Sequence, residues 1–362
     1  MSASWMMGGA DPDRSIAALL ELIMLKASTP AASRIWSGVV SSLGVLCASI
    51  GAAHLLLGIA KCLQFVTTQF LRPALDLEAR YGSGSWAVVT GASAGIGLGF
   101  AVELAKRNFN IVLISRNMDR LKAAQDEVIA ARPGVKTRVV SADFKECGAA
   151  TFWARFYDDH LADLDVSVLI NNVGVNHTKP FTAIPEEFLL DIVPVNCTSQ
   201  MMMTRKLINK LVDRCQATPD GVRRRSAVVS VSSVAGQRPL LYLAPYCATK
   251  AFNDFFSRAL ALEFGHALDV LSLRPGYVVS NMSKLTQKGG FVLDRYECAS
   301  GCLEKLGHVK ETYGDPRHAV YARSFFLLPE FILSRRRRKR LEEKNAAIQL
   351  ASASSTSPLY GL

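Results

Sequence analysis

Two residues in the segment "PYCATKAF" have the types and the spacing for acid–base chemistry. Tyr246 and Lys250 are four positions apart, so on a helix their side chains would share one face. A free tyrosine has a pKa of ~10, and a nearby lysine cation favours the phenolate, which would bring that pKa toward neutrality. The same pair can also be plain surface decoration, so its meaning depends on the rest of the chain.

A glycine-rich loop, "VTGASAGIG", joins an apolar run to a helical pattern. Its glycines allow a tight turn and a close backbone approach to a pyrophosphate, whose charge the helix N-terminus would meet. The spacing departs from GxGxxG because Phe100 stands in the third place, but the strand, loop and helix context supports a dinucleotide site. The candidate cofactor-binding residues in this loop are Gly91, Ser93, Gly95, Ile96 and Gly97.

The second apolar run ends in "LISRN", which places Arg116 where NAD-binding proteins carry Asp or Glu. A guanidinium can pair with a 2′-phosphate through two parallel hydrogen bonds, and no carboxylate stands there to repel it. We therefore predict NADP(H) as the cofactor. An arginine that only caps a loop would leave the choice between NAD and NADP open.

The elements that must position these residues alternate between strands and helices. Helical patterns are expected over about 95–107, 118–131, 186–215 and 246–264. The apolar runs between them are "WAVVTG", "NIVLIS", "KTRVVSADF", "VSVLINN", "SAVVSVSS" and "DVLSLRPG". This order predicts an α/β fold with a single Rossmann-type, doubly wound parallel sheet, covered on both faces. After Pro275 the pattern becomes irregular, and residues 281–318 are expected to cover a cleft.

An N-terminal segment, residues 35–60, has the composition of a membrane anchor. It carries no charged residue, lies between Arg34 and Lys61, and exceeds the ~20 residues that span a bilayer. We predict a hydrophobic anchor helix; a hairpin, an interfacial helix and a buried soluble helix are the alternatives. The upstream "SIAALLELIML" is expected to lie along the membrane surface. The predicted division is a membrane-associated segment (1–75), a catalytic domain (80–335) and a basic, flexible tail (336–362).

The net charge of +11 is concentrated in two runs, Arg335–Arg340 and Arg223–Arg225. Neither run is interleaved with aromatic residues or accompanied by zinc-finger spacing, so nucleic acid is not a predicted partner. Such runs can also bind acidic lipid or an import receptor, or can simply be solvated ends of helices. The eight cysteines form no CxxC pairs, which predicts reduced thiols facing the cytosol and no metal site.

Several motifs occur together in a characteristic order. They are Thr90-Gly91-x-x-x-Gly95-x-Gly97, Asn171-Asn172-Val173-Gly174, Ser233, Tyr246-x-x-x-Lys250 and "RPGYVVS". With them, residues 80 to 335 resemble the short-chain dehydrogenase/reductase superfamily. Within it, "NNVG", "YCATKAFNDFFSRAL" and "RPGYV", preceded by a hydrophobic segment, resemble the membrane-bound very-long-chain 3-oxoacyl-CoA reductase group. Close relatives of that group include 17β-hydroxysteroid dehydrogenases.

The resemblance implies a catalytic tetrad of Asn196, Ser233, Tyr246 and Lys250. Ser233 is preferred to Ser232 because it precedes Tyr246 by thirteen residues, as the family pattern has it. Tyr246 would act as general acid in the reductive direction, and Ser233 would donate a hydrogen bond to the substrate carbonyl. Asn196 would bend its helix and hold a water that relays protons to Lys250.

The resemblance also implies further cofactor contacts. Asp143 would contact the adenine, Asn172 would lie beside the ribose, and Val278 and Ser280 would meet the nicotinamide carboxamide. Tyr246 and Lys250 would also face the cofactor, with Lys250 hydrogen-bonded to the nicotinamide ribose.

The implied activity is NADPH-dependent reduction of 3-oxoacyl-CoA to 3-hydroxyacyl-CoA in very-long-chain fatty-acid elongation. The implied location is the endoplasmic reticulum membrane with the catalytic domain facing the cytosol, and the implied partners are a lipid substrate, a homodimer and an elongation complex. One alternative is a 17β-hydroxysteroid dehydrogenase or another lipid-ketone oxidoreductase. A dinucleotide-binding scaffold without activity is the other. Two departures from the family pattern are Cys247, where Ser is usual, and Ser280, where Thr is commoner.

Overall fold

A computed structural model describes residues 30–68, 72–216, 223–335, 337–339 and 342. The chain divides into two compact units, residues 1–70 and 71–362. The upstream segment "SIAALLELIML" and the tail beyond residue 342 lie outside the described residues, as do Arg336 and Arg340.

The first unit contributes one long helix, α2 (Pro30–Val66). Within it, Ser33–Val66 has a mean hydropathy of 2.0, and it is the one described helix long and apolar enough to cross a bilayer. The helix is continuous and its described side chains are almost all exposed, so this segment is neither a hairpin nor a core helix. The segment is therefore a candidate membrane anchor.

The second unit is built on a seven-stranded parallel sheet in the order β3-β2-β1-β4-β5-β6-β9. The strands are β1 (Trp86–Thr90), β2 (Asn110–Ser115), β3 (Thr137–Ser141), β4 (Val166–Asn171), β5 (Ser226–Val231), β6 (Leu268–Leu273) and β9 (Glu311–Thr312). All six predicted strands are present. The short β9 was not predicted, because two residues without an apolar run carry no strand signal. A separate pair joins β7 (Tyr277–Val278) to β8 (Val292–Leu293).

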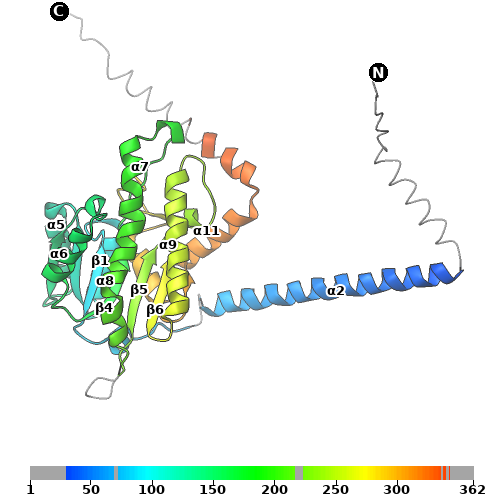
Figure 1. Cartoon of the computed structure of the whole chain (residues 1–362), viewed down its shortest axis with the longest axis horizontal. Coiled ribbons are helices and arrows are strands. Elements are labelled where there is room, and N and C mark those ends of the chain that lie inside the picture. Colours follow the sequence, from blue (N-terminus) through cyan, green and yellow to red (C-terminus); the bar gives the residue numbers. More distant parts are fainter. Residues whose placement is uncertain (1–29, 69–71, 217–222, 336, 340–341, 343–362) are drawn as a thin grey trace, which may run out of the picture. The chain divides into compact units, whose positions relative to one another are not determined.

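Helices cover both faces of this sheet. One face packs against α4 (Gly95–Ala105), α5 (Met118–Ala131) and α10 (Arg295–Leu303). The other packs against α6 (Ala150–His160), α8 (Ser199–Asp213) and α9 (Ala244–Glu263), and α8 and α9 cross it in Figure 1. Strands β4, β5 and β6 are buried along their whole length, which explains their lack of polar alternation.

Two predicted segments differ from the structure. The helical stretch expected over 186–215 consists of α7 (Glu186–Val193), a π-helical turn (Pro194–Thr198) and α8. The expectation that all of 281–318 covers the cleft is wrong, because α10 packs against α4 instead. The backbones approach closely there, since a Cβ on Gly99 would overlap the carbonyl oxygen of Arg295. Only the first part of this segment reaches the cleft.

The strand order reverses between β1 and β4, so the loops that follow these two strands diverge at the carboxyl edge of the sheet. In open parallel sheets this switch point is where ligands bind. Two further helices of the unit are α3 (Leu77–Tyr81), which precedes β1, and α11 (Pro316–Leu327), which follows β9.

Candidate active site

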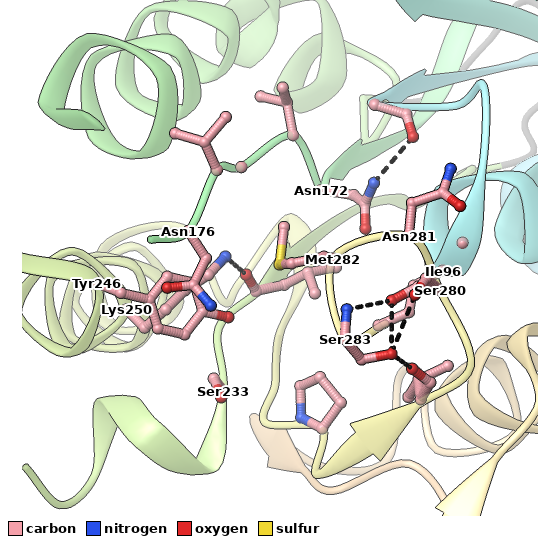
Figure 2. Close-up of a pocket in the computed structure, with 18 of the residues that line it drawn as sticks. Ile96, Asn172, Asn176, Ser233, Tyr246, Lys250, Ser280, Asn281, Met282 and Ser283 are labelled. Atoms are coloured by element: carbon pink, nitrogen blue, oxygen red, sulfur yellow. Dashed lines mark hydrogen bonds between the residues drawn. The ribbon is translucent and has the colours of Figure 1, made fainter. Parts of the chain in front are cut away.

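A cleft of about 430 Å³ opens at this switch point. Twelve of the predicted site residues line it: Gly91, Ser93, Gly95, Ile96, Arg116, Asp143, Asn172, Ser233, Tyr246, Lys250, Val278 and Ser280. Figure 2 shows Ser233, Tyr246 and Lys250 toward one side of the view and Ile96 and Ser280 toward the other. Gly97 and Asn196 do not line the cleft, and both lie in the structure that supports it.

Tyr246 and Lys250 lie on the first turns of α9, which begins with Pro245 in its first turn. The Lys250 side chain is 3% exposed, and its Nζ donates a hydrogen bond of 2.7 Å to the carbonyl oxygen of Val231. The same Nζ lies 5.8 Å from the centre of the Tyr246 ring. The spacing of four residues therefore places both side chains together at the cleft.

The Lys250 cation alone does not lower the pKa of Tyr246. The predicted lowering also relies on the positive nicotinamide ring of the oxidised cofactor, and it stays a prediction. Burial raises the pKa of Tyr246 to about 12, and a hydrogen bond with Ser233 opposes this rise only in part. Burial also lowers the pKa of Lys250 to about 8. The reason is that removal from water penalises both charged forms, the phenolate and the ammonium. At neutral pH the phenol is thus protonated, the form that a proton donor needs.

Ser233 and Ser232 are placed differently, although both line the cleft. The Ser232 hydroxyl donates to the carbonyl oxygen of Lys250 at 2.7 Å, so this hydroxyl is bound to the backbone of α9. The Ser233 hydroxyl accepts from the amide of Ala235 at 3.1 Å, and its proximity to the Tyr246 phenol acts to lower the pKa of that phenol. The Ser232 hydroxyl is therefore engaged by the backbone of α9, and the catalytic role of Ser233 stays a prediction.

Asn196 occupies the π-helical turn between α7 and α8, so the helix is interrupted at this residue. Its side chain accepts from the amide of Val175 at 2.8 Å and donates to the carbonyl oxygen of Val175 at 3.1 Å. It also donates to the hydroxyl of Thr249 at 3.0 Å. Asn196 thus joins the loop after β4 to α9. Sequence reasoning missed Thr249, whose position one residue before Lys250 was the available signal.

The glycine-rich loop fits a dinucleotide. Gly91 has a φ of +66°, and a Cβ there would meet the side chain of Asn172 and the backbone of Val173. A Cβ on Gly97 would overlap the carbonyl oxygen of Gly91. The N-cap residue of α4, Ala94, offers no side chain to the first amides of the helix, which remain available to a phosphate.

The loops after β1 and β4 are tied to each other. The amides of Asn172 and Val173 donate to the Thr90 hydroxyl at 2.9 and 3.1 Å. The side chain of Asn172 donates to the carbonyl oxygens of Thr90 at 2.9 Å and Gly91 at 3.2 Å. These hydrogen bonds fix the two loops to each other where they border the cleft, and Figure 2 shows Asn172 at this place.

Arg116, after β2, is exposed, and no described residue forms an ion pair with its guanidinium. Arg120, in the first turn of α5, lines the same end of the cleft and was not predicted. Its spacing of four from Arg116 was the signal that could have found it. Asp143 accepts from the amide of Lys145 at 3.1 Å and caps the short helix Phe144–Glu146.

The loop after β7 lies next to the glycine-rich loop, since a Cβ on Gly95 would meet the side chain of Ser280 at 3.2 Å. The Ser283 hydroxyl donates to the carbonyl oxygen of Val278 at 2.6 Å and hydrogen-bonds Ser280. Asn281, Met282 and Ser283 line the cleft beside these two residues, as Figure 2 shows.

The tyrosine end of the cleft is mostly apolar and was not predicted residue by residue. Leu240 and Leu243 pack with Tyr246, and the further lining residues of the cleft are Val175, Asn176, Tyr277, Met282, Tyr321 and Arg337. Tyr321 lies 6.0 Å from Tyr277, ring centre to ring centre, and 5.8 Å from Phe291. These residues come from five separate loops and helices, so no local pattern predicted them.

A doubly wound parallel sheet, with a phosphate-binding loop and a Ser–Tyr–Lys group in one cleft, defines a class of dinucleotide-dependent oxidoreductases. Residues 85–289 match the short chain dehydrogenase family model. The chain belongs to the short-chain dehydrogenase family, whose members use a nicotinamide dinucleotide.

Several known proteins are similar to this chain. A very-long-chain 3-oxoacyl-CoA reductase of Mycosarcoma maydis is 34% identical over 294 residues, covering 78% of this chain and 80% of the relative. Hydroxysteroid dehydrogenase-like protein 1 of Gallus gallus is 36% identical over 71% of this chain and 76% of its own length. A solved 7β-hydroxysteroid dehydrogenase structure covers 69% of this chain and 94% of its own, with a TM-score of 0.59 and 23% identity, which supports the fold. The reductase relative and the apolar helix α2 together indicate a membrane-anchored protein.

Proposed function

We propose that this protein is a membrane-bound, NADPH-dependent reductase that converts 3-oxoacyl-CoA to 3-hydroxyacyl-CoA in very-long-chain fatty-acid elongation. The observation that carries the proposal is the meeting of Ser233, Tyr246 and Lys250 in one cleft, between a dinucleotide loop and an apolar wall. The similarity to very-long-chain 3-oxoacyl-CoA reductases supports the acyl-CoA substrate.

When bound, the reduced nicotinamide supplies the hydride for the carbonyl carbon. Tyr246 gives its proton to the carbonyl oxygen, since its phenol is protonated at neutral pH. Ser233 donates a hydrogen bond to the same oxygen and stabilises the charge that develops there. The Lys250 ammonium stabilises the phenolate that proton transfer leaves behind. Asn196 holds the loop of Val175 against α9 and is the candidate support for a proton-relaying water.

The cofactor end of the cleft supports NADP(H) over NAD(H). Arg116 and Arg120 both line this end, and no described carboxylate pairs with Arg116. Their guanidinium groups suit a ribose 2′-phosphate. Gly91, Ser93, Gly95, Ile96 and Gly97 are the proposed pyrophosphate loop, and Asp143, Asn172, Val278 and Ser280 are the proposed adenine, ribose and carboxamide contacts.

The location and partners follow from the same proposal. Residues 1–75 would hold the chain in the endoplasmic reticulum membrane, residues 80–335 would form the catalytic domain on the cytosolic side, and residues 336–362 would form a basic tail. A homodimer and a fatty-acid elongation complex are the proposed assemblies.

A steroid or another lipid ketone is the second candidate substrate. The rings of Tyr277 and Tyr321, which contact each other and line the cleft, offer aromatic surface to a rigid ring system. The Gallus gallus relative named hydroxysteroid dehydrogenase-like protein 1 points the same way.

The test is NADPH oxidation by detergent-solubilised protein with a long-chain 3-oxoacyl-CoA and, separately, with estrone. Tyr246→Phe removes the proton donor and should lower the rate roughly 10²- to 10⁴-fold. Tyr157→Phe makes the same chemical change outside the cleft and should leave the rate unchanged.

Equal turnover by wild type and Tyr246→Phe would refute the mechanism. A preference for estrone would favour the steroid candidate, and no turnover of any lipid ketone would favour a dinucleotide-binding scaffold.

A further inference from the structure

The C-terminal basic run returns to the active-site cleft. Residues 330–335 and 337–339 are helical, and Arg337 from this segment lines the same cleft as Tyr246 and Lys250. Of the described members of the run, Arg335, Arg338 and Lys339 are exposed and do not line the cleft, whereas Arg337 is half-buried. Among the described members of the run, Arg337 thus differs from its neighbours in being half-buried and in lining the cleft.

No carboxylate among the described residues neutralises the charge of Arg337. Its Nε is buried without a hydrogen-bond partner, and among the residues that the structure describes no carboxylate forms an ion pair with it. A buried, unpaired guanidinium nitrogen is costly unless something else accepts its hydrogen bond. The position therefore calls for an acceptor that enters the cleft.

Arg337 lies near the start of α9, the helix that carries Tyr246. Its charge acts on the thiol of Cys247, the residue after Tyr246, where burial raises the pKa and Arg337 counteracts part of that rise. The 2′-phosphate position at Arg116 belongs to the loop after β2, on another part of the sheet. An acceptor at Arg337 would thus belong to the substrate.

A defined set of contacts holds the C-terminal segment near the site. Arg238, in the loop between Ser233 and Tyr246, donates hydrogen bonds of 2.8 Å to the carbonyl oxygens of Phe325 and Leu328. Its guanidinium also lies 5.5 Å from the centre of the Phe325 ring. The end of α11 is therefore fastened to the catalytic loop, and the segment with Arg337 follows directly.

The tyrosine end of the cleft combines this cation with apolar surface. Leu240, Leu243, Tyr277 and Tyr321 line it together with Arg337. Such a combination suits a ligand with an apolar part and an anionic part. We propose that Arg337 binds the phosphate groups of the substrate's thioester carrier, so that the cleft selects coenzyme A thioesters over neutral lipid ketones. This inference rests on the proposed function and names the residue that recognises the carrier.

The experiment compares Arg337→Gln with Arg338→Gln, which removes the same charge from an exposed neighbour. Each full-length protein, in neutral detergent, reduces a 3-oxoacyl-CoA and the N-acetylcysteamine thioester of the same acid, which carries no phosphate. For Arg337→Gln we expect kcat/KM on the coenzyme A thioester to fall roughly tenfold or more, with the phosphate-free thioester unchanged. Arg338→Gln should leave both values within about threefold, and Arg337→Lys should recover part of the loss.

Equal losses on both thioesters, or no loss on either, would overturn the assignment of Arg337. A fold control is the affinity for NADPH, which Arg337→Gln should leave unchanged because the proposed contacts to the cofactor's phosphates are the glycine-rich loop and Arg116.

Binding of coenzyme A to the NADPH-bound protein, measured by calorimetry, separates this inference from the proposed function. If wild type reduces no 3-oxoacyl thioester, the proposed function is wrong. Arg337 would still stand as an anion site if Arg337→Gln weakens coenzyme A binding tenfold. Equal coenzyme A affinity in both proteins would refute the site whatever the turnover.

Discussion

Burial changes the acid–base properties of Tyr246 and Lys250 in opposite directions. The pKa of Tyr246 rises to about 12, and that of Lys250 falls to about 8. Near pH 7 the phenol therefore keeps its proton, while most of the Lys250 population remains charged. The pair is set to donate a proton in reduction, and a charged lysine inside the protein must lower the stability of the fold.

Lys250→Met should raise stability and abolish activity. The fall of the Lys250 pKa from 10.5 to about 8 corresponds to about 3 kcal/mol of penalty on the buried ammonium at neutral pH. Loss of the hydrogen bond to Val231 offsets about 1 kcal/mol of this. We expect the free energy of unfolding at pH 7 to rise by about 2 kcal/mol, measured by urea denaturation.

The pH dependence gives the check on this reasoning. Because the folded pKa of Lys250 is depressed, the unfolded state binds more protons between about pH 8 and 10.5. Wild-type stability should therefore gain from rising pH in that window relative to Lys250→Met. A variant less stable than wild type at pH 7 would show that Lys250 supports the fold.

Arg116→Asp should change the cofactor preference. The substitution removes a partner for a 2′-phosphate and adds a carboxylate that repels it while suiting a ribose hydroxyl. We expect kcat/KM for NADPH to fall about 100-fold relative to NADH. Arg132→Asp, an exposed charge reversal at the other end of α5, should leave the ratio unchanged. An unaltered preference in Arg116→Asp would refute the cofactor prediction.

At the scale of elements, the site depends on contacts between segments far apart in the chain. The π-helical turn at Asn196 brings its side chain to the backbone of Val175, and through Thr249 to α9. A regular helix would rotate this side chain away from both partners. The interruption is therefore what joins the β4 loop to the helix that carries Tyr246.

His318 gives α11 a comparable role toward the loop after β6. Its Nδ1 accepts from the amide of Gly276 at 3.2 Å, so the ring is neutral, and its Nε2 donates to the carbonyl oxygen of Tyr277 at 3.1 Å. The side chain is fully buried, and burial lowers its pKa. Protonation of Nδ1 would break the hydrogen bond to Gly276 and disturb the loop that leads to Val278.

Protonation of His318 should therefore lower the stability of the fold as the pH falls. Since its folded pKa lies below the ordinary value of 6.5, the unfolded state takes up the proton first, and the contribution is complete only above about pH 6.5. Between pH 7 and 5 the free energy of unfolding, measured by urea denaturation, should fall more for the wild type than for His318→Gln. His266→Gln changes an exposed histidine and should behave like wild type. Parallel pH profiles for wild type and His318→Gln would contradict this account.

At the scale of the whole molecule, the catalytic unit has its own core and its own N-terminal closure. Two apolar clusters fill the two faces of the sheet within residues 71–362. Asp269, at the start of β6, accepts hydrogen bonds from Arg80 at 2.6 Å and from Tyr81 at 2.9 Å. The helix α3 is thus fixed to the sheet. An N-terminal truncation that ends before α3 preserves this contact.

Expression of residues 71–362 alone should yield a folded protein that binds NADPH. Because α2 is the candidate anchor, this shorter protein should leave the membrane fraction, whereas the full chain stays in it. The measurement is membrane flotation after high-salt washing, combined with NADPH fluorescence. Retention of the shorter protein in the membrane fraction would place the anchor in residues 71–362.

The sequence by itself determined the six main strands, because continuous apolar runs separated by helical patterns are a local signal. It also indicated which Gly, Ser, Tyr, Lys and Arg residues could serve a dinucleotide-dependent reaction, because the order and spacing of the motifs can be read directly from the chain. Only the tertiary structure decided the direction of the Tyr246 pKa, since burial depends on what packs around the phenol. It also decided the packing of α10 on α4, and it placed Arg120 and Arg337 in the same cleft. These outcomes depend on contacts between residues far apart in the chain, and no local pattern encodes them.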